Sequence, residues 1–209
     1  MLIYVRVCYF NVISYYLTIS CVIKEKRMFT ETVEYSVGSK IFKGYVAYND
    51  GDAQLKPAML IFHAFEGCND LMKKHARDAA QKGYVGFAVD MYGDGVVAHT
   101  LEGCMAHMNE CAQDRQVLRQ RAMAALNTVK SIDVVNADQV VAVGFCFGGK
   151  CVLDLARTGE NVKAAVCMHG GLDAPEGMEQ VPITASVLVI NGYIDPQLPK
   201  DDLLAFADE

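Results

Sequence analysis

The sequence has no excess of positive charge and no basic cluster along one face of a predicted element. Its 209 residues include 19 lysines and arginines against 25 aspartates and glutamates, for a formal net charge of −6 at pH 7. Nucleic acid is therefore not an expected partner. Internal repeats and low-complexity tracts are absent too. With 52% apolar and 21% charged residues, the chain is expected to form one globular domain with a sizeable core.

Regular cysteine spacing is also lacking. The eight cysteines lie at irregular intervals, at positions 8, 21, 68, 104, 111, 146, 151 and 167. Disulfide frameworks are typical of short secreted chains with evenly paired cysteines, and this chain is neither short nor regular. We therefore expect a protein of the reducing cytoplasm with free thiols.

One long apolar run stands apart from the rest of the chain. Residues 2–23 are apolar except for Arg6 and a few small polar residues, and KEKR follows at residues 24–27. A membrane-spanning helix needs about 20 apolar residues, and basic flanking residues favour the cytoplasmic side. No small-residue cleavage pattern of a signal peptide ends the run. Residues 1–27 are interpreted as a hydrophobic extension or a membrane anchor, so the protein is cytoplasmic or anchored through this run. The domain is predicted over residues 28–209.

The rest of the chain alternates between strand and helix patterns. Predicted strands cover 32–37 and 41–48, which form a hairpin, then 58–62, 84–89, 139–143, 162–168 and 186–190. Predicted helices cover 70–82, 109–130, 148–157 and 201–207, and the glycine-rich residues 93–103 are expected to form a loop. This alternation predicts a three-layer α/β fold, mostly parallel, with helices on both faces of the sheet. Ligands bind such sheets outside the carboxyl ends of the strands, where HAFEG, DMYGDG, GFCFGG, MHGG and NGYIDP are predicted to meet.

The stretch VVAVGFCFGGKC, residues 140–151, fits two kinds of site. Gly144, Gly149 and Lys150 have the spacing of a phosphate-binding loop, G-x-x-x-x-G-K. That loop continues with Ser or Thr as a Mg²⁺ ligand, whereas this chain has Cys151, a soft ligand that suits Mg²⁺ poorly. Two phenylalanines also occupy the loop, and several strands precede it. These departures disfavour a phosphate site.

The same stretch also fits a nucleophile elbow, a tight turn between a strand and a helix. The elbow pattern is G-x-S-x-G, and here Gly144 and Gly148 flank Cys146 at those positions. A helix N-terminus favours the thiolate, so we expect Cys146 to be more acidic than a free thiol. The backbone N–H of Phe147 would then point at a developing oxyanion. The alternative is an inert, buried thiol in front of a helix.

Together these segments resemble the dienelactone hydrolase family, a branch of the α/β-hydrolases, over residues 28–209. GFCFGG is similar to the family's nucleophile segment, and HAFEG to the loop whose second oxyanion N–H would be that of Phe65. The Asp-x-Tyr of DMYGDG is a further match, and NGYIDP resembles the segment with the acid of the triad, Asp195. The resemblance implies hydrolysis of a small ester or lactone by Cys146, with no cofactor and no metal. It leaves the oligomeric state open.

The chain departs from the family pattern at two points. The founding enzymes have a Glu three residues before the loop glycine, where this chain has Ala64, and its own loop carboxylate is Glu66. The resemblance therefore does not imply that this chain acts on the same dienelactone as the founding enzymes. The order in this fold is nucleophile, acid, histidine, yet all five histidines precede Asp195. We expect the triad histidine and the last strand and helix of the fold to be missing, and the polypeptide to be a weak or inactive hydrolase. The alternative is a non-catalytic binding protein of the same fold.

Other polar residues near the strand ends have weaker patterns. His63, Glu66, Tyr92 and His169 are possible rim residues that face a substrate, although a hydrogen-bonded structural role is favoured for His63. The spacing of Cys104, His107 and Cys111 is that of metal ligands, but zinc sites need a fourth ligand and none is evident. A redox pair of Cys146 and Cys151 is disfavoured, because residues five apart on a helix do not face each other.

Overall fold

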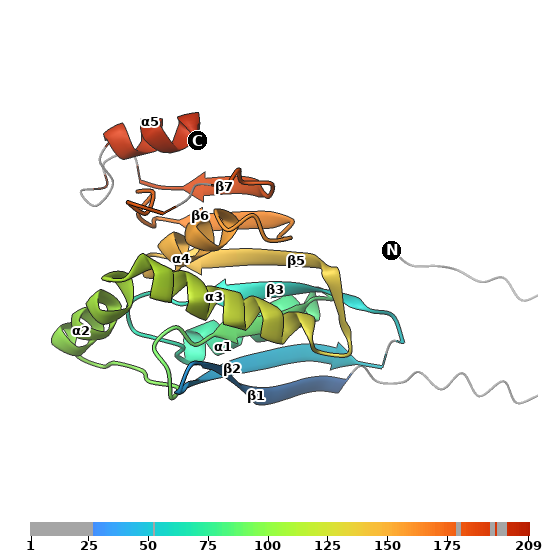
Figure 1. Cartoon of the computed structure of the whole chain (residues 1–209). Coiled ribbons are helices and arrows are strands. Elements are labelled where there is room, and N and C mark those ends of the chain that lie inside the picture. Colours follow the sequence, from blue (N-terminus) through green and yellow to red (C-terminus); the bar gives the residue numbers. More distant parts are fainter. Residues whose placement is uncertain (1–26, 52, 179–180, 193–194, 196–199) are drawn as a thin grey trace, which may run out of the picture.

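A seven-stranded sheet forms the centre of the computed structural model, which describes residues 27–51, 53–178, 181–192, 195 and 200–209. The strand order is β1-β2-β4-β3-β5-β6-β7 (Figure 1). The strands are β1 (Arg27–Val37), β2 (Lys40–Asp50), β3 (Lys56–Phe62), β4 (Val85–Val89), β5 (Val135–Phe145), β6 (Ala164–Met168) and β7 (Ser186–Ile190). The helices are α1 (Asp70–Gln81), α2 (Leu101–Ala112), α3 (Arg115–Lys130), α4 (Phe147–Ala156) and α5 (Lys200–Asp208).

The sheet is mostly parallel, as the alternation of elements predicts. Strand β3 pairs in parallel with β4 and β5, and β6 joins β5 to β7 in the same direction. The hairpin of β1 and β2 is antiparallel and pairs with β4 through β2. Gly38 has a φ of 58° in the turn, a conformation that glycine adopts without the cost of a side chain. The carboxyl ends of β3 to β7 therefore lie at one edge of the sheet.

Helices cover both faces of the sheet because alternate residues of each strand point to opposite sides. In β3, Leu60 and Phe62 belong to the large core cluster formed with α3 and α4, whereas Ile61 packs in a second cluster with Met72 and Ala76 of α1. Helix α1 lies behind the sheet in Figure 1, and α3 and α4 lie in front of it. This confirms the three-layer arrangement.

The region of residues 93–130 differs from the sequence prediction. Helix α2 begins at Leu101, inside the segment expected to be a loop, and the single helix expected over 109–130 is two helices. The break lies at Asp114, whose carboxylate accepts hydrogen bonds from the N–H groups of Gln116 and Val117 at 2.9 and 3.1 Å. Such a cap stabilises a new helix start by about 1 kcal/mol, so the chain turns there. The turn directs α2 toward the carboxyl ends of the strands.

No helix in the described ranges is long and apolar enough to span a membrane. The predicted extension or anchor over residues 2–23 lies outside the described residues. Six cysteines fall within them, at positions 68, 104, 111, 146, 151 and 167, and all six are free thiols. The expectation of free thiols is thus met for the cysteines that the structure describes.

Candidate active site

Cys146 occupies a strained turn between β5 and α4. Strand β5 ends at Phe145 and α4 begins at Phe147, so a single residue makes the connection. Cys146 has a φ of 53° and a ψ of −115°, a conformation that costs a non-glycine residue about 1–3 kcal/mol. Two backbone hydrogen bonds hold it: its N–H donates to Met168 O and its carbonyl accepts from Gly149 N–H, both at 2.9 Å. The geometry is that of the predicted nucleophile elbow.

The two glycines of the predicted pattern are required by close backbone packing. A Cβ on Gly144 would lie 2.0 Å from Gly148 O. A Cβ on Gly148 would lie 2.4 Å from the carbonyl oxygen of Phe62 in the neighbouring strand. Helix α4 can therefore start directly above β3 and β5 only because these positions have no side chain.

The thiol of Cys146 is half-buried, and burial raises its pKa above the ordinary value. The hydrogen bond from Phe147 N–H lowers the pKa, whereas the carboxylates of Glu66 and Asp195 raise it further. The prediction of an unusually acidic thiol is therefore wrong. The helix N-terminus does favour the thiolate, but desolvation and two nearby negative charges outweigh it.

A cavity of about 310 Å³ opens over Cys146. Its walls come from three segments: α2, the start of α4 and the loop after β6. The lining residues are Met108, Asn109, Ala112, Cys146, Phe147, Lys150, His169, Gly171 and Asp173. Helix α2, which the sequence prediction placed partly in a loop, thus supplies one wall of the candidate site.

Two of the predicted site residues, His169 and Asp195, approach Cys146 from β6 and β7. His169 follows β6, has a φ of 45° and is exposed along the cavity; its N–H donates to Ile190 O at 2.7 Å. Asp195 lies beyond β7 and is half-buried, and its carboxylate raises the pKa of the Cys146 thiol. The topology therefore brings the predicted nucleophile and the predicted acid to the same edge of the sheet.

The loop after β3, which contains Phe65, is fastened to the loop after β4. The hydroxyl of Tyr92 donates to Phe65 O at 2.9 Å, and Ala98 N–H donates to Glu66 O at 2.9 Å. A single β-bridge between Gly67 and Val97 continues the contact. These bonds fix the backbone of Phe65 relative to the rest of the domain.

His63 and Tyr92 do not line the cavity over Cys146. His63 has the hydrogen-bonded structural role that the sequence favoured, whereas the expectation that Tyr92 lies at the rim is not met. Met91 N–H donates to Nε2 of His63 at 3.2 Å, and Nδ1 of His63 lies 2.5 Å from Ala64 O. His63 is fully buried, and burial lowers its pKa. The neutral ring is therefore committed to two backbone groups and cannot also take a proton from Cys146. Tyr92 is 3% exposed, and its ring packs edge-on against the His63 ring with the two ring centroids 4.6 Å apart.

Glu66 does lie at the surface of this edge. It is half-exposed and lines a shallow hollow of about 650 Å³ together with Lys73 and His99. Its carboxylate raises the pKa of the Cys146 thiol. Of the four predicted rim residues, His169 lines the cavity over Cys146, and Glu66 lines this separate hollow.

Asp90 is an organising residue that the sequence analysis did not identify. Its buried carboxylate accepts four backbone N–H bonds, from Lys43, Tyr92, Gly93 and Gly95, at 2.8–3.0 Å. A carboxylate that accepts several amide donors fixes the backbone segments that supply them. The sequence DMYGDG contains a signal for this role, because an Asp followed by two glycines is typical of turns in which the Asp side chain bonds to the backbone.

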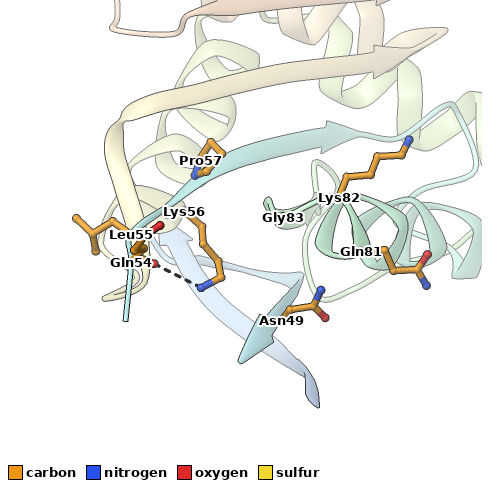
Figure 2. Close-up of a pocket in the computed structure, with 8 residues that line it drawn as sticks. All are labelled: Asn49, Gln54, Leu55, Lys56, Pro57, Gln81, Lys82 and Gly83. Carbon is orange, nitrogen blue, oxygen red and sulfur yellow. Dashed lines mark hydrogen bonds between the residues drawn. The ribbon is translucent and has the colours of Figure 1, made fainter. Parts of the chain in front are cut away.

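A second hollow, of about 350 Å³, lies at the opposite edge of the sheet (Figure 2). It is bordered by the start of β3 and the end of α1, and its lining is mostly lysine and amide side chains. Lys56 points along it and donates to Gln54 O at 3.4 Å. It holds no nucleophile and lies at the amino ends of the parallel strands, whereas ligands of this fold class bind at the carboxyl ends.

The structure does not support the alternative sites considered from the sequence. Lys150 is bonded to Asp173 at 2.8 Å, and Gly148 packs on the backbone of β3, so no phosphate cradle is formed. The thiols of Cys104 and Cys111 donate to separate carbonyls, and no group of three metal-ligating side chains occurs among the described residues. Cys151 is completely buried, which removes it as a redox partner of Cys146.

Comparisons with known proteins concern the family and the fold of the chain. Residues 42–209 match the sequence profile of the Dienelactone hydrolase family. A dienelactone hydrolase-like promiscuous phosphotriesterase from metagenomic libraries has a similar structure, with a TM-score of 0.80 and 33% identity, covering 87% of this chain and 75% of that chain. A Bradyrhizobium protein named "Probable 2-oxo-3-(5-oxofuran-2-ylidene)propanoate lactonase" is 27% identical over 72% of this chain. An uncharacterized protein of Caenorhabditis elegans is 36% identical over 44% of this chain.

The matched regions span 64% of the Bradyrhizobium protein and 60% of the Caenorhabditis elegans protein. The family profile covers most of this chain, including the elbow at Cys146 and the loop of Phe65. The sheet topology is that of the α/β-hydrolases with similar structures. On these grounds the chain belongs to the dienelactone hydrolase family.

Proposed function

We propose that the protein hydrolyses small carboxylic esters or lactones through Cys146. The observation that carries the proposal is the strained turn at Cys146, which holds the thiol at the edge of a cavity with the N–H of Phe147 directed at it. A positive φ at a cysteine costs conformational energy, and backbone strain of this kind is typical of catalytic residues. The name of the Bradyrhizobium relative supports a lactone among the substrates, but Ala64 in the loop leaves the individual lactone open.

The proposed reaction has two steps. The sulfur of Cys146 attacks the carbonyl carbon, and an electron pair moves onto the carbonyl oxygen, where the N–H groups of Phe147 and Phe65 stabilise it. The oxyanion's electron pair then re-forms the carbonyl as the C–O bond breaks, the leaving alkoxide takes up the proton that the thiol has lost, and a thioester remains on Cys146. Water attacks this thioester, which releases the acid and restores the thiol. One ester and one water thus give one alcohol and one acid.

Proton transfer limits this reaction. Because the pKa of the Cys146 thiol is raised, most of the thiol is protonated at neutral pH and needs a base. Asp195 is proposed as the acid that would orient a histidine. Within the described residues, however, no histidine is hydrogen-bonded to Cys146, and His63 is committed elsewhere. We therefore propose that this polypeptide forms the thioester more readily than it hydrolyses it.

An activated ester tests both steps. With p-nitrophenyl acetate we expect a burst of one equivalent of p-nitrophenol per protein, followed by slow turnover. Peptide mapping should place the acetyl group on Cys146. The burst should disappear in Cys146→Ala and remain in Cys104→Ala, which removes a buried thiol on α2. Acetylation of another residue, or a burst that survives Cys146→Ala, would reject Cys146 as the nucleophile.

A second candidate is a binding protein of the same fold without catalysis. The raised pKa of the Cys146 thiol favours it, because a protonated thiol is a weak nucleophile. In that case esters would bind in the cavity, but no acetyl group would appear on Cys146. The burst experiment therefore distinguishes the two candidates.

A further inference from the structure

The hollow at the amino ends of the parallel strands contains a buried lysine (Figure 2). Lys56 is 7% exposed, and its side chain extends from the start of β3 into this hollow of about 350 Å³. An ammonium group has three donors. Within the described residues they form one long hydrogen bond, 3.4 Å to Gln54 O. A charged group is costly to remove from water unless it is paired, so the hollow offers donors in search of an acceptor.

An irregularity in the sheet places Lys56 at this position. Lys56 lies opposite Val135 of β5. Ala58 lies opposite Val140, so the pairing of the two strands shifts between Lys56 and Ala58. Regular alternation would put Lys56 on the face of Ala58, which packs in the large core cluster. A bulge redirects a side chain, and Lys56 lines the hollow together with the end of α1. Its backbone N–H, which donates to Val134 O at 2.8 Å, keeps the base of the side chain in place.

The charged side chains that line the hollow are positive. Lys82, which is exposed at the end of α1, lines it together with Lys56, and neither lysine forms an ion pair within the described residues. Asp50 lies near the hollow at the end of β2, but its Oδ1 accepts from the next backbone N–H at 2.8 Å. On α1, Asp78 is paired with Lys74 at 2.7 Å. None of the described residues that line the hollow is a carboxylate, so an anion there would meet two cations.

The end of α1 does not cancel this charge. The last carbonyls of a helix carry partial negative charge, which would repel an anion. Here Ala79 O accepts from two N–H groups of the turn that follows α1, at 3.0 and 3.1 Å. Ala80 O accepts from Nδ2 of Asn49 at 2.9 Å. These carbonyls are therefore hydrogen-bonded, and the ammonium group of Lys82 adds a full positive charge at the same helix end.

We propose that this hollow is a second ligand site, separate from the active site, and that it binds a phosphate group through Lys56. Lysine binds phosphate as a point charge, and the amide side chains of Gln54 and Gln81 supply further donors. A volume of about 350 Å³ is at the lower end of the range for small-molecule sites, which fits a phosphate group with a small substituent. Because the hollow and Cys146 lie at opposite edges of the sheet, this ligand is not the substrate of the proposed hydrolysis.

Thermal melts of the full chain in detergent test the proposal, with inorganic phosphate as the probe. Phosphate replaces sodium chloride at constant ionic strength, so that screening stays equal. Phosphate also stabilises folded proteins without binding to a site, so its effect is compared between variants. Lys56→Met removes the charge and keeps most of the aliphatic chain. Lys163→Met is the matched control, because Lys163 is exposed just before β6, at the same edge of the sheet but outside the hollow.

We expect the melting temperature of the native protein to rise with phosphate and to saturate. At about ten times the dissociation constant, the rise should exceed that of Lys56→Met by about 3–5 °C. Lys163→Met should show the native rise. An equal rise in Lys56→Met and the native protein would overturn the proposal. Should Lys56→Met fail to fold, nuclear magnetic resonance of the native protein decides: phosphate should shift the amide resonances of residues 54–56 and 81–83, and unchanged resonances there reject the site.

A soluble phosphate and a lipid headgroup present the same chemistry to the hollow. Strand β1 begins at Arg27, opposite Asp50 at this edge of the sheet, and the apolar run of residues 2–23 precedes it in the sequence. Sedimentation with phosphatidylcholine vesicles, with and without phosphatidic acid, separates the two sources. A gain with phosphatidic acid that Lys56→Met abolishes assigns the hollow to a lipid headgroup. A saturating rise with inorganic phosphate and no such gain assigns it to a soluble phosphate. The absence of both effects rejects the proposal.

Discussion

Gly148 gives the sharpest test of how the fold positions Cys146. Its Cβ, if present, would lie 2.4 Å from Phe62 O and 2.6 Å from His63 O, about 1 Å inside an ordinary carbon–oxygen contact. Both oxygens belong to the backbone of β3 and its following residue, so no flexible side chain can move aside. In Gly148→Ala, helix α4 must therefore shift away from the sheet by a large part of that distance.

The magnitude follows from two opposing effects. Alanine in place of glycine inside a helix stabilises by about 1 kcal/mol, whereas overpacking against fixed atoms costs about 1–3 kcal/mol or more. We expect the free energy of unfolding to fall by about 1–2 kcal/mol in Gly148→Ala. A displacement of the nucleophile by about 1 Å can slow a reaction about 100-fold, so acetylation of Cys146 should suffer more than stability does.

Urea denaturation and the burst rate with p-nitrophenyl acetate measure these two quantities. Gly192→Ala serves as the control, because a Cβ on Gly192 would meet no atom of the described residues within 4 Å. The reasoning fails if Gly148→Ala unfolds at the same urea concentration as the native protein and is acetylated at the native rate. It also fails if Gly192→Ala is as damaging as Gly148→Ala.

Three further predictions concern the thiol, the loops and the chain start. The rate of Cys146 alkylation by iodoacetamide should rise with pH to a midpoint above that of free cysteine, because the pKa of the thiol is raised; a midpoint below it would contradict this. Asp90→Asn should lower the free energy of unfolding by about 2–3 kcal/mol by urea denaturation, since several N–H groups lose a charged acceptor. Asp94→Asn, at an exposed position with a φ of 55°, should change it little. A protein that starts at Met28 should melt at the same temperature as the full chain in detergent, and a large loss would show that residues 1–27 pack in the core.

Local patterns in the sequence were sufficient for the elements that lead to Cys146. The run of apolar residues in β5, the glycines at 144 and 148 and the following helix are neighbours in sequence, so their signals reinforce each other. The break between α2 and α3 was missed because residues 109–130 contain no glycine or proline that would mark an interruption. The cap by Asp114 decides it, and a single polar residue inside a helical pattern is a weak signal.

The surroundings of the site depend on contacts that no local pattern contains. The orientation of His63 is decided by contacts of its ring with the backbone of Ala64 and of Met91, which lies in the loop after β4. The pKa of Cys146 was predicted from the helix N-terminus alone, but Glu66 and Asp195 reach it from loops after β3 and β7. Desolvation and long-range charge appear only once these segments are brought together.

The bonds of Asp90 connect the hairpin to the proposed oxyanion loop. Lys43 N–H in β2 donates to the Asp90 carboxylate, the same carboxylate accepts from Tyr92 N–H, and the hydroxyl of Tyr92 donates to Phe65 O. Three hydrogen bonds thus link the backbone of Lys43 to the backbone of Phe65. We expect a displacement of β2 at Lys43 to move Phe65 as well. Substitutions that raise or lower activity need not lie in the cavity, and a laboratory selection for new substrates should also recover changes in the hairpin, at the margin of the sheet.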